Sequence, residues 1–200
     1  MRERRGRGRR ITVVTAGVIA LAAVVVLAGC EEAGAGGGSG SGSGGGSPSV
    51  AVSEALLTTG TDDGTTVVAL SLFSQLGDDY DVPDGTDLIQ IYFFVDTEGE
   101  EINGDVDLAA STAEGNASAT VGENLNQSDN RWFVATSGTV DTEIPDFSKT
   151  TSGTTENVSV EGTISIQQFL PEWQPTTAEF SVSYDGPATV VSEDDMEDYQ

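Results

Sequence analysis

The sequence predicts an all-β domain built as an antiparallel two-sheet sandwich. Between residues 49 and 192, 12 glycines separate short apolar stretches, and none of these stretches keeps a 3.6-residue apolar period. Several of them instead alternate apolar and polar residues, which is typical of a strand with one buried face. These observations favour sheets over helices throughout the folded part.

Two late segments show the alternation most clearly. Apolar residues occupy every second position of 178–184, opposite Glu179, Ser181 and Ser183, and 158–166 repeats this pattern. The segment 88–95 is apolar on both faces apart from Gln90, which suits a central strand. In chain order, the predicted strands are 49–58, 65–75, 88–95, 102–110, 117–121, 131–142, 158–166 and 178–184.

Glycine, proline and Asx corners separate these segments. About eight strands at such spacing favour an immunoglobulin-like topology. A barrel or a jelly roll stays open as the alternative, because strand order cannot be read from one sequence. The predicted corners are Asp62-Asp63-Gly64, Pro83-Asp84-Gly85, Glu98-Gly99, Asn103-Gly104 and Asp185-Gly186-Pro187.

The first 29 residues are predicted to be an export signal. Six of the eight basic residues lie in the first ten positions, and the uncharged, mostly apolar run 11–27 follows them. That run is close to the length of about 20 residues that spans a bilayer as a helix, so an uncleaved membrane anchor is the competing interpretation. The basic residues are Arg2, Arg4, Arg5, Arg7, Arg9 and Arg10.

Residues 31–48 are predicted to be a flexible tether. They contain nine glycines with interleaved serines and no large apolar side chain, so they cannot bury much surface. The last eight residues include five carboxylates and are predicted to be a solvated tail. The predicted organisation is a signal peptide at 1–29, an anchor cysteine and linker at 30–48, a sandwich domain at 49–192 and an acidic tail at 193–200.

The chain beyond the signal is almost free of positive charge. Of 33 carboxylates only Glu3 precedes Cys30, so 32 carboxylates face Arg131 and Lys149 alone. Nucleic acid is excluded as a partner, because phosphate binding needs clustered Lys and Arg. This excess of carboxylates over basic residues predicts a protein adapted to concentrated salt. In molar salt the Debye length is about 3 Å, so repulsion between the carboxylates is screened. An acidic protein that binds a basic partner at low salt is the competitor.

Two motifs carry a resemblance to known exported proteins. Leu27-Ala28-Gly29-Cys30 resembles the lipobox of lipoproteins, in which the cysteine thiol receives a lipid, and Arg9-Arg10 resembles a twin-arginine export signal. With the polar linker and the acidic exterior, these motifs resemble lipoproteins of salt-loving archaea. The resemblance implies an extracytoplasmic protein on the outer face of the cell membrane, anchored through lipid at Cys30.

The residue types restrict the chemistry. Histidine is absent and Cys30 is the only cysteine, which excludes Ser-His-Asp and Cys-His nucleophiles, His-ligated zinc or copper, and internal disulfides. Carboxylates remain, as in glycoside hydrolysis, but no pair stands out among them. We therefore expect a binding or structural module at the cell surface, without catalysis of its own. A carboxylate-based, glycosidase-like hydrolase and an accessory subunit of an envelope or transport complex are the alternatives.

Three groups of residues are candidate sites. Oxygen ligands concentrated in one loop suit calcium, although a solvated acidic loop explains them as well, and no other cofactor is expected. Two tryptophans could stack on a sugar ring, although such residues more often close the end of a core. A surface protein or a carbohydrate is the expected partner of the module. Three Asn-X-Ser sequons could carry glycans. The calcium candidates are Asp78, Asp79, Asp81, Asp84 and Asp87, the stacking candidates are Trp173 and Trp132, and the sequons begin at Asn116, Asn126 and Asn157.

Overall fold

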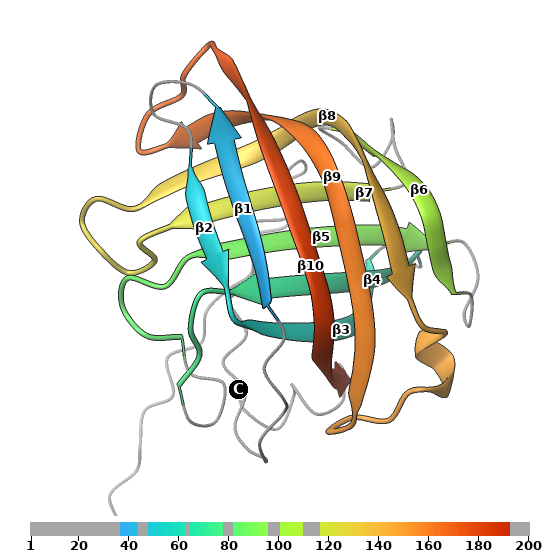
Figure 1. Cartoon of the computed structure of the whole chain (residues 1–200). Helices are drawn as coiled ribbons and strands as arrows, with labels where there is room; N and C mark the ends of the chain where they lie inside the picture. Colours follow the sequence, from blue (N-terminus) through green and yellow to red (C-terminus); the bar gives the residue numbers. More distant parts are fainter. Residues whose placement is uncertain are drawn as a thin grey trace, which may run out of the picture.

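The computed structural model describes residues 37–43, 48–62, 65–77, 82–95, 101–109 and 117–192. These residues form ten strands and one short 3-10 helix, η2, at Phe147–Lys149, which confirms the all-β prediction (Figure 1). No helix among them has the length and apolar character needed to cross a membrane. The strands are β1 (Gly37–Ser43), β2 (Ser49–Val52), β3 (Glu54–Asp62), β4 (Thr65–Phe73), β5 (Leu88–Val95), β6 (Ile102–Ala109), β7 (Ala117–Glu123), β8 (Arg131–Ile144), β9 (Thr155–Leu170) and β10 (Thr177–Ser192).

The sheet topology differs from the predicted antiparallel two-sheet sandwich. Hydrogen bonds join all ten strands into one sheet, in the order β2-β1-β10-β3-β4-β5-β7-β6-β8-β9. The sheet is mixed rather than antiparallel, since β10 pairs with β3 and β6 with β7 in parallel. The immunoglobulin-like topology is therefore not confirmed. That prediction depended on the number and the spacing of the strands, and these two quantities do not determine which strands pair with each other.

The sheet closes on itself because β9 pairs with β8 on one side and with β10 on the other, and two long strands also change partners along their length. β10 pairs with β1 over its first half and with β3 over its last residues, while β9 runs along its other edge. In the same way β8 pairs first with β7 and then with β6, opposite β9. The strands β3, β4, β5 and β7 consequently lie behind β1, β10 and β9 and run across them (Figure 1).

The core lies between these two layers and follows from the alternation in the sequence. Phe180, Val182 and Tyr184 of β10 are buried, while the residues between them are exposed. The Tyr184 hydroxyl donates to the carbonyl of Pro187 at 2.6 Å, so the buried ring keeps its polar atom paired. Facing it across the core, the second layer contributes Leu57, Val68, Leu70, Ile89, Ile91 and Phe93.

Two glycines allow β8 and β9 to come close where they leave the second layer. Gly138 has a φ of +148°, and a Cβ there would lie 2.7 Å from Ile164 Cα. A Cβ on Gly162 would lie 2.4 Å from the Thr139 carbonyl oxygen. The pairing of β8 with β9 shifts between Ala135 and Ser137, just before this point. A bulge followed by close backbone contact is how a long strand bends from one layer into another.

The stretch predicted to be a flexible tether contains a strand. Gly37–Ser43 forms β1, which pairs with β10 on one side and with β2 on the other. In this register Gly38 lies opposite both Tyr184 and Val52, and Gly40 lies opposite both Val182 and Val50. Glycine thus occupies positions on the core side, between neighbours whose side chains fill the space. Main-chain hydrogen bonds hold β1, although its composition is that of a linker.

Two predicted corners lie inside strands instead. Asn103-Gly104 belongs to β6, where Gly104 takes a φ of +89° without ending the strand. Asp185-Gly186-Pro187 belongs to β10. Residues 186–188 pair with β9 on one edge, but on the other edge they lie between the β1 and β3 pairings and have no partner. The missing N–H of Pro187 is tolerated at such an unpaired edge. The corner Pro83-Asp84-Gly85 is a turn, with φ +82° at Gly85. Gly64 and the Glu98-Gly99 corner lie outside the described residues.

Candidate functional site

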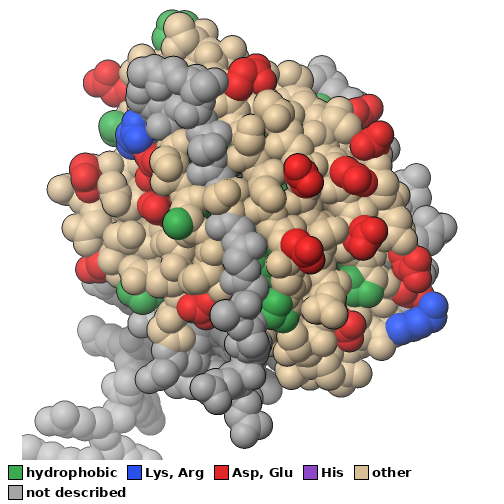
Figure 2. Space-filling view, viewed as in Figure 1, with side chains coloured by type: hydrophobic (Ala, Val, Ile, Leu, Met, Phe, Trp, Pro, Cys, Tyr) green, Lys and Arg blue, Asp and Glu red, His purple; other side chains and the backbone are tan. Residues whose placement is uncertain are grey.

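One outer surface of the sheet is almost entirely acidic and hydroxylic. The outward side chains of β6, β8, β9 and β10 form it, and we call it the acidic face (Figure 2). Carboxylates from four strands project from it, with Ser and Thr between them. Its carboxylates are Asp105, Asp107, Asp141, Glu143, Glu161, Glu179 and Asp185.

The strand register aligns three of these carboxylates in a row. Asp105 lies opposite Asp141, and Asp141 lies opposite Glu161. Side chains that are directly opposite have Cβ atoms about 4.5–5.5 Å apart, and like charges at that distance destabilise a sheet. The three carboxylates of this row therefore repel one another across the strands.

Hydroxyl groups on the acidic face take up part of the negative charge. Thr139 Oγ1 donates to Asp107 Oδ1 at 2.9 Å, and Ser165 Oγ donates to Glu179 Oε1 at 2.9 Å. Such bonds between neighbouring strands fix the carboxylates in place. The sequence predicted which side of each strand is polar. Which carboxylates lie opposite one another on neighbouring strands could be seen only from the strand register in the structure.

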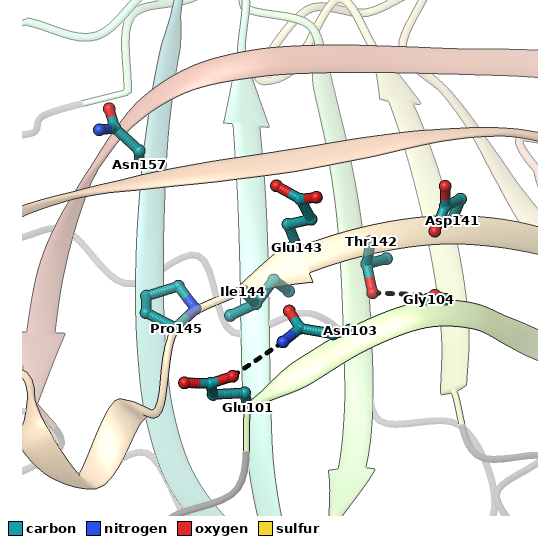
Figure 3. Close-up of a pocket in the computed structure, with 9 residues that line it drawn as sticks. All are labelled: Glu101, Asn103, Gly104, Asp141, Thr142, Glu143, Ile144, Pro145 and Asn157. Carbon is teal, nitrogen blue, oxygen red and sulfur yellow. Dashed lines mark hydrogen bonds between the residues drawn. The ribbon is translucent and has the colours of Figure 1, made fainter.

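A hollow of about 490 Å³ lies at one end of the acidic face, between β6, β8 and the start of β9 (Figure 3). Glu101, Asp141 and Glu143 are among its lining residues. The Glu101 carboxylate accepts a hydrogen bond from Asn103 Nδ2 at 2.9 Å and does not point toward Glu143.

Both basic residues of the described part are engaged in ion pairs. Arg131 pairs with Glu123, whose other oxygen accepts a hydrogen bond from the Ser49 backbone N–H at 3.0 Å. Lys149 pairs with Asp146, and the hydrogen bond and charge of Asp146 raise the pKa of Lys149. Glu123 and Asp146 are nearly buried, so each cation neutralises a carboxylate that the fold encloses. A ligand with negative charge would find only carboxylates on the acidic face.

Among the described residues, Trp173 is the exposed large aromatic residue, and it lies just after the end of β9, whereas the hollow lies beside the start of β9. Trp173, in the loop that joins β9 to β10, is 59% exposed, and Leu170, the last residue of β9, is 40% exposed. Side-chain and backbone contacts fix this loop, which also contains Pro171 and Pro175. Gln174 N donates to Gln168 O at 3.0 Å, Gln167 Nε2 to Gln174 O at 2.7 Å, and Gln168 Nε2 to Glu172 O at 3.3 Å.

We call residues 170–175 the tryptophan tip. A fixed loop that presents a large aromatic ring to solvent offers a flat apolar surface at low cost in conformational entropy. Of the two stacking candidates, Trp173 is therefore available to a ligand. The sequence singled out Trp173 through its flanking prolines, but the three glutamines that hold the loop carried no recognisable signal.

Trp132 lies in a different environment. It packs against a second apolar cluster formed by Leu56, Phe73, Val82, Leu88 and Leu125, on the outer side of β3, β4 and β5. It therefore helps to close this cluster, as tryptophans at the end of a sheet commonly do.

The candidate calcium loop is only partly described. Asp78, Asp79 and Asp81 lie outside the described residues. Asp84 is exposed in a turn, whereas Asp87 Oδ1 accepts a hydrogen bond from Asn124 N at 3.0 Å and so links two loops. Among the described residues no group of three potential ligands is arranged to hold a metal.

Two of the three sequons lie on described surface. Asn126 is exposed in a turn with φ +63°, and Asn157 is exposed on β9 beside the hollow. Asn116 lies outside the described residues, as do Cys30, Arg9 and Arg10. Comparisons of the chain with protein-family models, with curated proteins and with solved structures gave no match.

Proposed function

We propose that this chain is a lipid-anchored, extracytoplasmic binding module on the cell surface of a halophile, without catalysis of its own. The observation that carries the proposal is the tryptophan tip, a fixed loop whose indole is 59% exposed to solvent. An exposed aromatic ring on a rigid support has no role in the core, and it matches the apolar face of a sugar ring.

The surroundings of the tip favour an uncharged ligand. Glu172 precedes Trp173, and carboxylates dominate the acidic face that extends from the tip along β9 and β10. An anionic ligand would be repelled at close range, where salt screens least. We therefore propose a neutral carbohydrate of the cell surface as the ligand.

Replacing Trp173 by alanine should weaken binding of neutral oligosaccharides at least about tenfold, the equivalent of roughly 1.4 kcal/mol. The measurement is calorimetric titration of the full chain in molar salt, with a panel of neutral cell-surface oligosaccharides. Glu172→Gln is the matched control, because it changes the neighbouring side chain but leaves the indole in place. Unchanged affinity in Trp173→Ala would exclude the tip as the binding site.

The anchor is tested separately. The chain purified from membranes should begin at Cys30 and carry added lipid mass, and Cys30→Ser should release it or leave it unprocessed. Intact mass spectrometry makes this measurement. A surface protein that still carries residues 1–27 would instead indicate an uncleaved helical anchor.

Stability should increase strongly with salt because screening reduces repulsion within the acidic face. We expect the midpoint of thermal unfolding to rise by about 10 °C or more between dilute buffer and molar salt, roughly 3 kcal/mol for a domain of this size. Glu161→Gln, which removes one member of the aligned row, should reduce this dependence. An equal midpoint at both salt concentrations would contradict adaptation to brine.

A further inference from the structure

An uncharged surface adjoins the tryptophan tip on the outer side of the sheet. In the pairing of β8 with β9, Trp132 lies opposite Leu170, and Val134 lies opposite Gln167. The neighbours of Trp132, Val134 and Gln167 along each strand include buried core residues, so these three side chains point outward. Each of the three is partly exposed, and Leu170 beside them is 40% exposed. We call Trp132, Val134 and Gln167 the outer platform.

The indole of Trp132 lies over a glycine of the neighbouring strand. Gly122 of β7 is its partner in the register, and a Cβ there would be 3.1 Å from Cζ3 and 3.2 Å from Cε3 of the ring. A residue without a side chain lets the ring come this close to the backbone. The ring thus packs against the sheet on one side and keeps part of its surface in solvent, where it can stack on a ligand that covers it.

The loop after Leu170 is held over the outer side of β9. Gln167, which points outward, donates from Nε2 to the carbonyl oxygen of Gln174 at 2.7 Å, so the residue after Trp173 lies beside the outer platform. Leu170 and Trp173 are three residues apart, which limits the distance between their Cα atoms to about 11 Å. Leu170 in turn lies opposite Trp132 in the register. The two tryptophans therefore belong to one surface, and Leu170 connects them.

We propose that the ligand of the tryptophan tip is a chain of linked neutral sugar units, with one unit stacked on Trp173 and a later unit on Trp132. This inference rests on the proposed carbohydrate function and extends its site along the outer platform. The platform carries no charge, and the Gln167 amide can exchange hydrogen bonds with hydroxyl groups. Two indoles joined by an uncharged surface fit a ligand whose apolar faces repeat, whereas a single sugar unit would cover only one ring.

The test observes each indole alone, because the chain contains only two tryptophans. In the full chain, Trp173→Phe leaves the fluorescence of Trp132, and Trp132→Phe leaves that of Trp173. The two variants are matched controls for each other, since phenylalanine keeps an aromatic ring at the changed position. The probes are neutral hexose oligosaccharides, from the single sugar to the hexasaccharide, titrated in molar salt. We expect a saturable shift to shorter wavelength from Trp173 with the short probes, and from Trp132 only with the long ones.

Affinity should increase with the length of the probe as well. By calorimetry, the hexasaccharide should bind the unsubstituted chain at least about tenfold more tightly than the single sugar. Leu170→Ser should reduce this gain to about threefold or less. Because Leu170 is 40% exposed, this variant also serves should thermal unfolding show that Trp132→Phe is misfolded.

The outcomes separate this inference from the proposed function. A response of Trp173 to every probe, with none from Trp132 and no gain in affinity with length, would overturn the extended site and leave the tryptophan tip as a carbohydrate site. If neither indole responds to any probe, the proposed function is wrong, and the extended site is wrong with it.

Discussion

Gly162→Ala should lower the free energy of unfolding by more than about 2 kcal/mol, a large effect for the addition of one methyl group. The new Cβ would lie 2.4 Å from the Thr139 carbonyl oxygen and 2.8 Å from Val140 Cα. Both atoms belong to the backbone of β8, so no side chain can rotate away. Relief of the clash requires β8 and β9 to separate where they bend between the two layers.

Gly104→Ala is the matched control for this substitution. Gly104 has a φ of +89°, and a Cβ there would have nothing within 4 Å, so its cost is backbone strain alone, about 1 kcal/mol. Chemical denaturation of both variants in molar salt gives the comparison. Equal losses in the two variants would mean that close contact between β8 and β9 does not limit the substitution.

Gly40→Pro should destabilise the domain by about 3 kcal/mol or more. Gly40 lies between β10 and β2, so proline would remove a hydrogen bond from the interior of the sheet. Among the described strands β2 pairs only with β1, and it buries Val50 at 1% and Val52 at 6% exposure. Loss of β1 would release both valines, each of which contributes about 1.5–3 kcal/mol when fully buried.

Ser39→Ala is the control, because Ser39 is exposed and alanine keeps the backbone hydrogen bonds. Unfolding by denaturant, together with amide hydrogen exchange of Val50 and Val52, measures the effect. Wild-type stability of Gly40→Pro would show that 37–43 behaves as the tether that its composition indicates.

The local part of the fold could be predicted from sequence because it depends on the two-residue period. The segment 88–95 coincides with β5, and 102–110 and 117–121 differ from β6 and β7 by one or two residues at their ends. The alternation in 178–184 also identified the core side of β10, where Phe180, Val182 and Tyr184 are buried.

The arrangement of the strands could not be predicted in the same way, because pairing depends on contacts between distant segments. The parallel pairing of β10 with β3 joins Thr189 to Leu56, and no local pattern indicates it. The strand β1 was not predicted, for another reason. Its Gly-Ser alternation has the period of a strand, but glycine on the core side carries no hydrophobic signal, and only the neighbouring valines show that this side is buried.

The candidate site was predicted in part. Trp173 and its prolines could be read from sequence, whereas its exposure, and the packing of Trp132 into an apolar cluster, required the structure. The absence of charge from β4 and β5 is visible in the sequence as well. That these two strands lie side by side is shown only by the register.

Under the proposed lipid anchor at Cys30, the position of β1 limits how far the module can stand from the bilayer. Seven peptide units join Cys30 to Gly37, the first residue of β1, and a chain of that length spans at most about 25 Å. Gly37 pairs with Asp185, while Ser43 pairs with Glu179, nearer the start of β10. The chain therefore enters β1 at the end of the sheet away from the tryptophan tip, so in the proposed anchored module Trp173 would project outward from the cell.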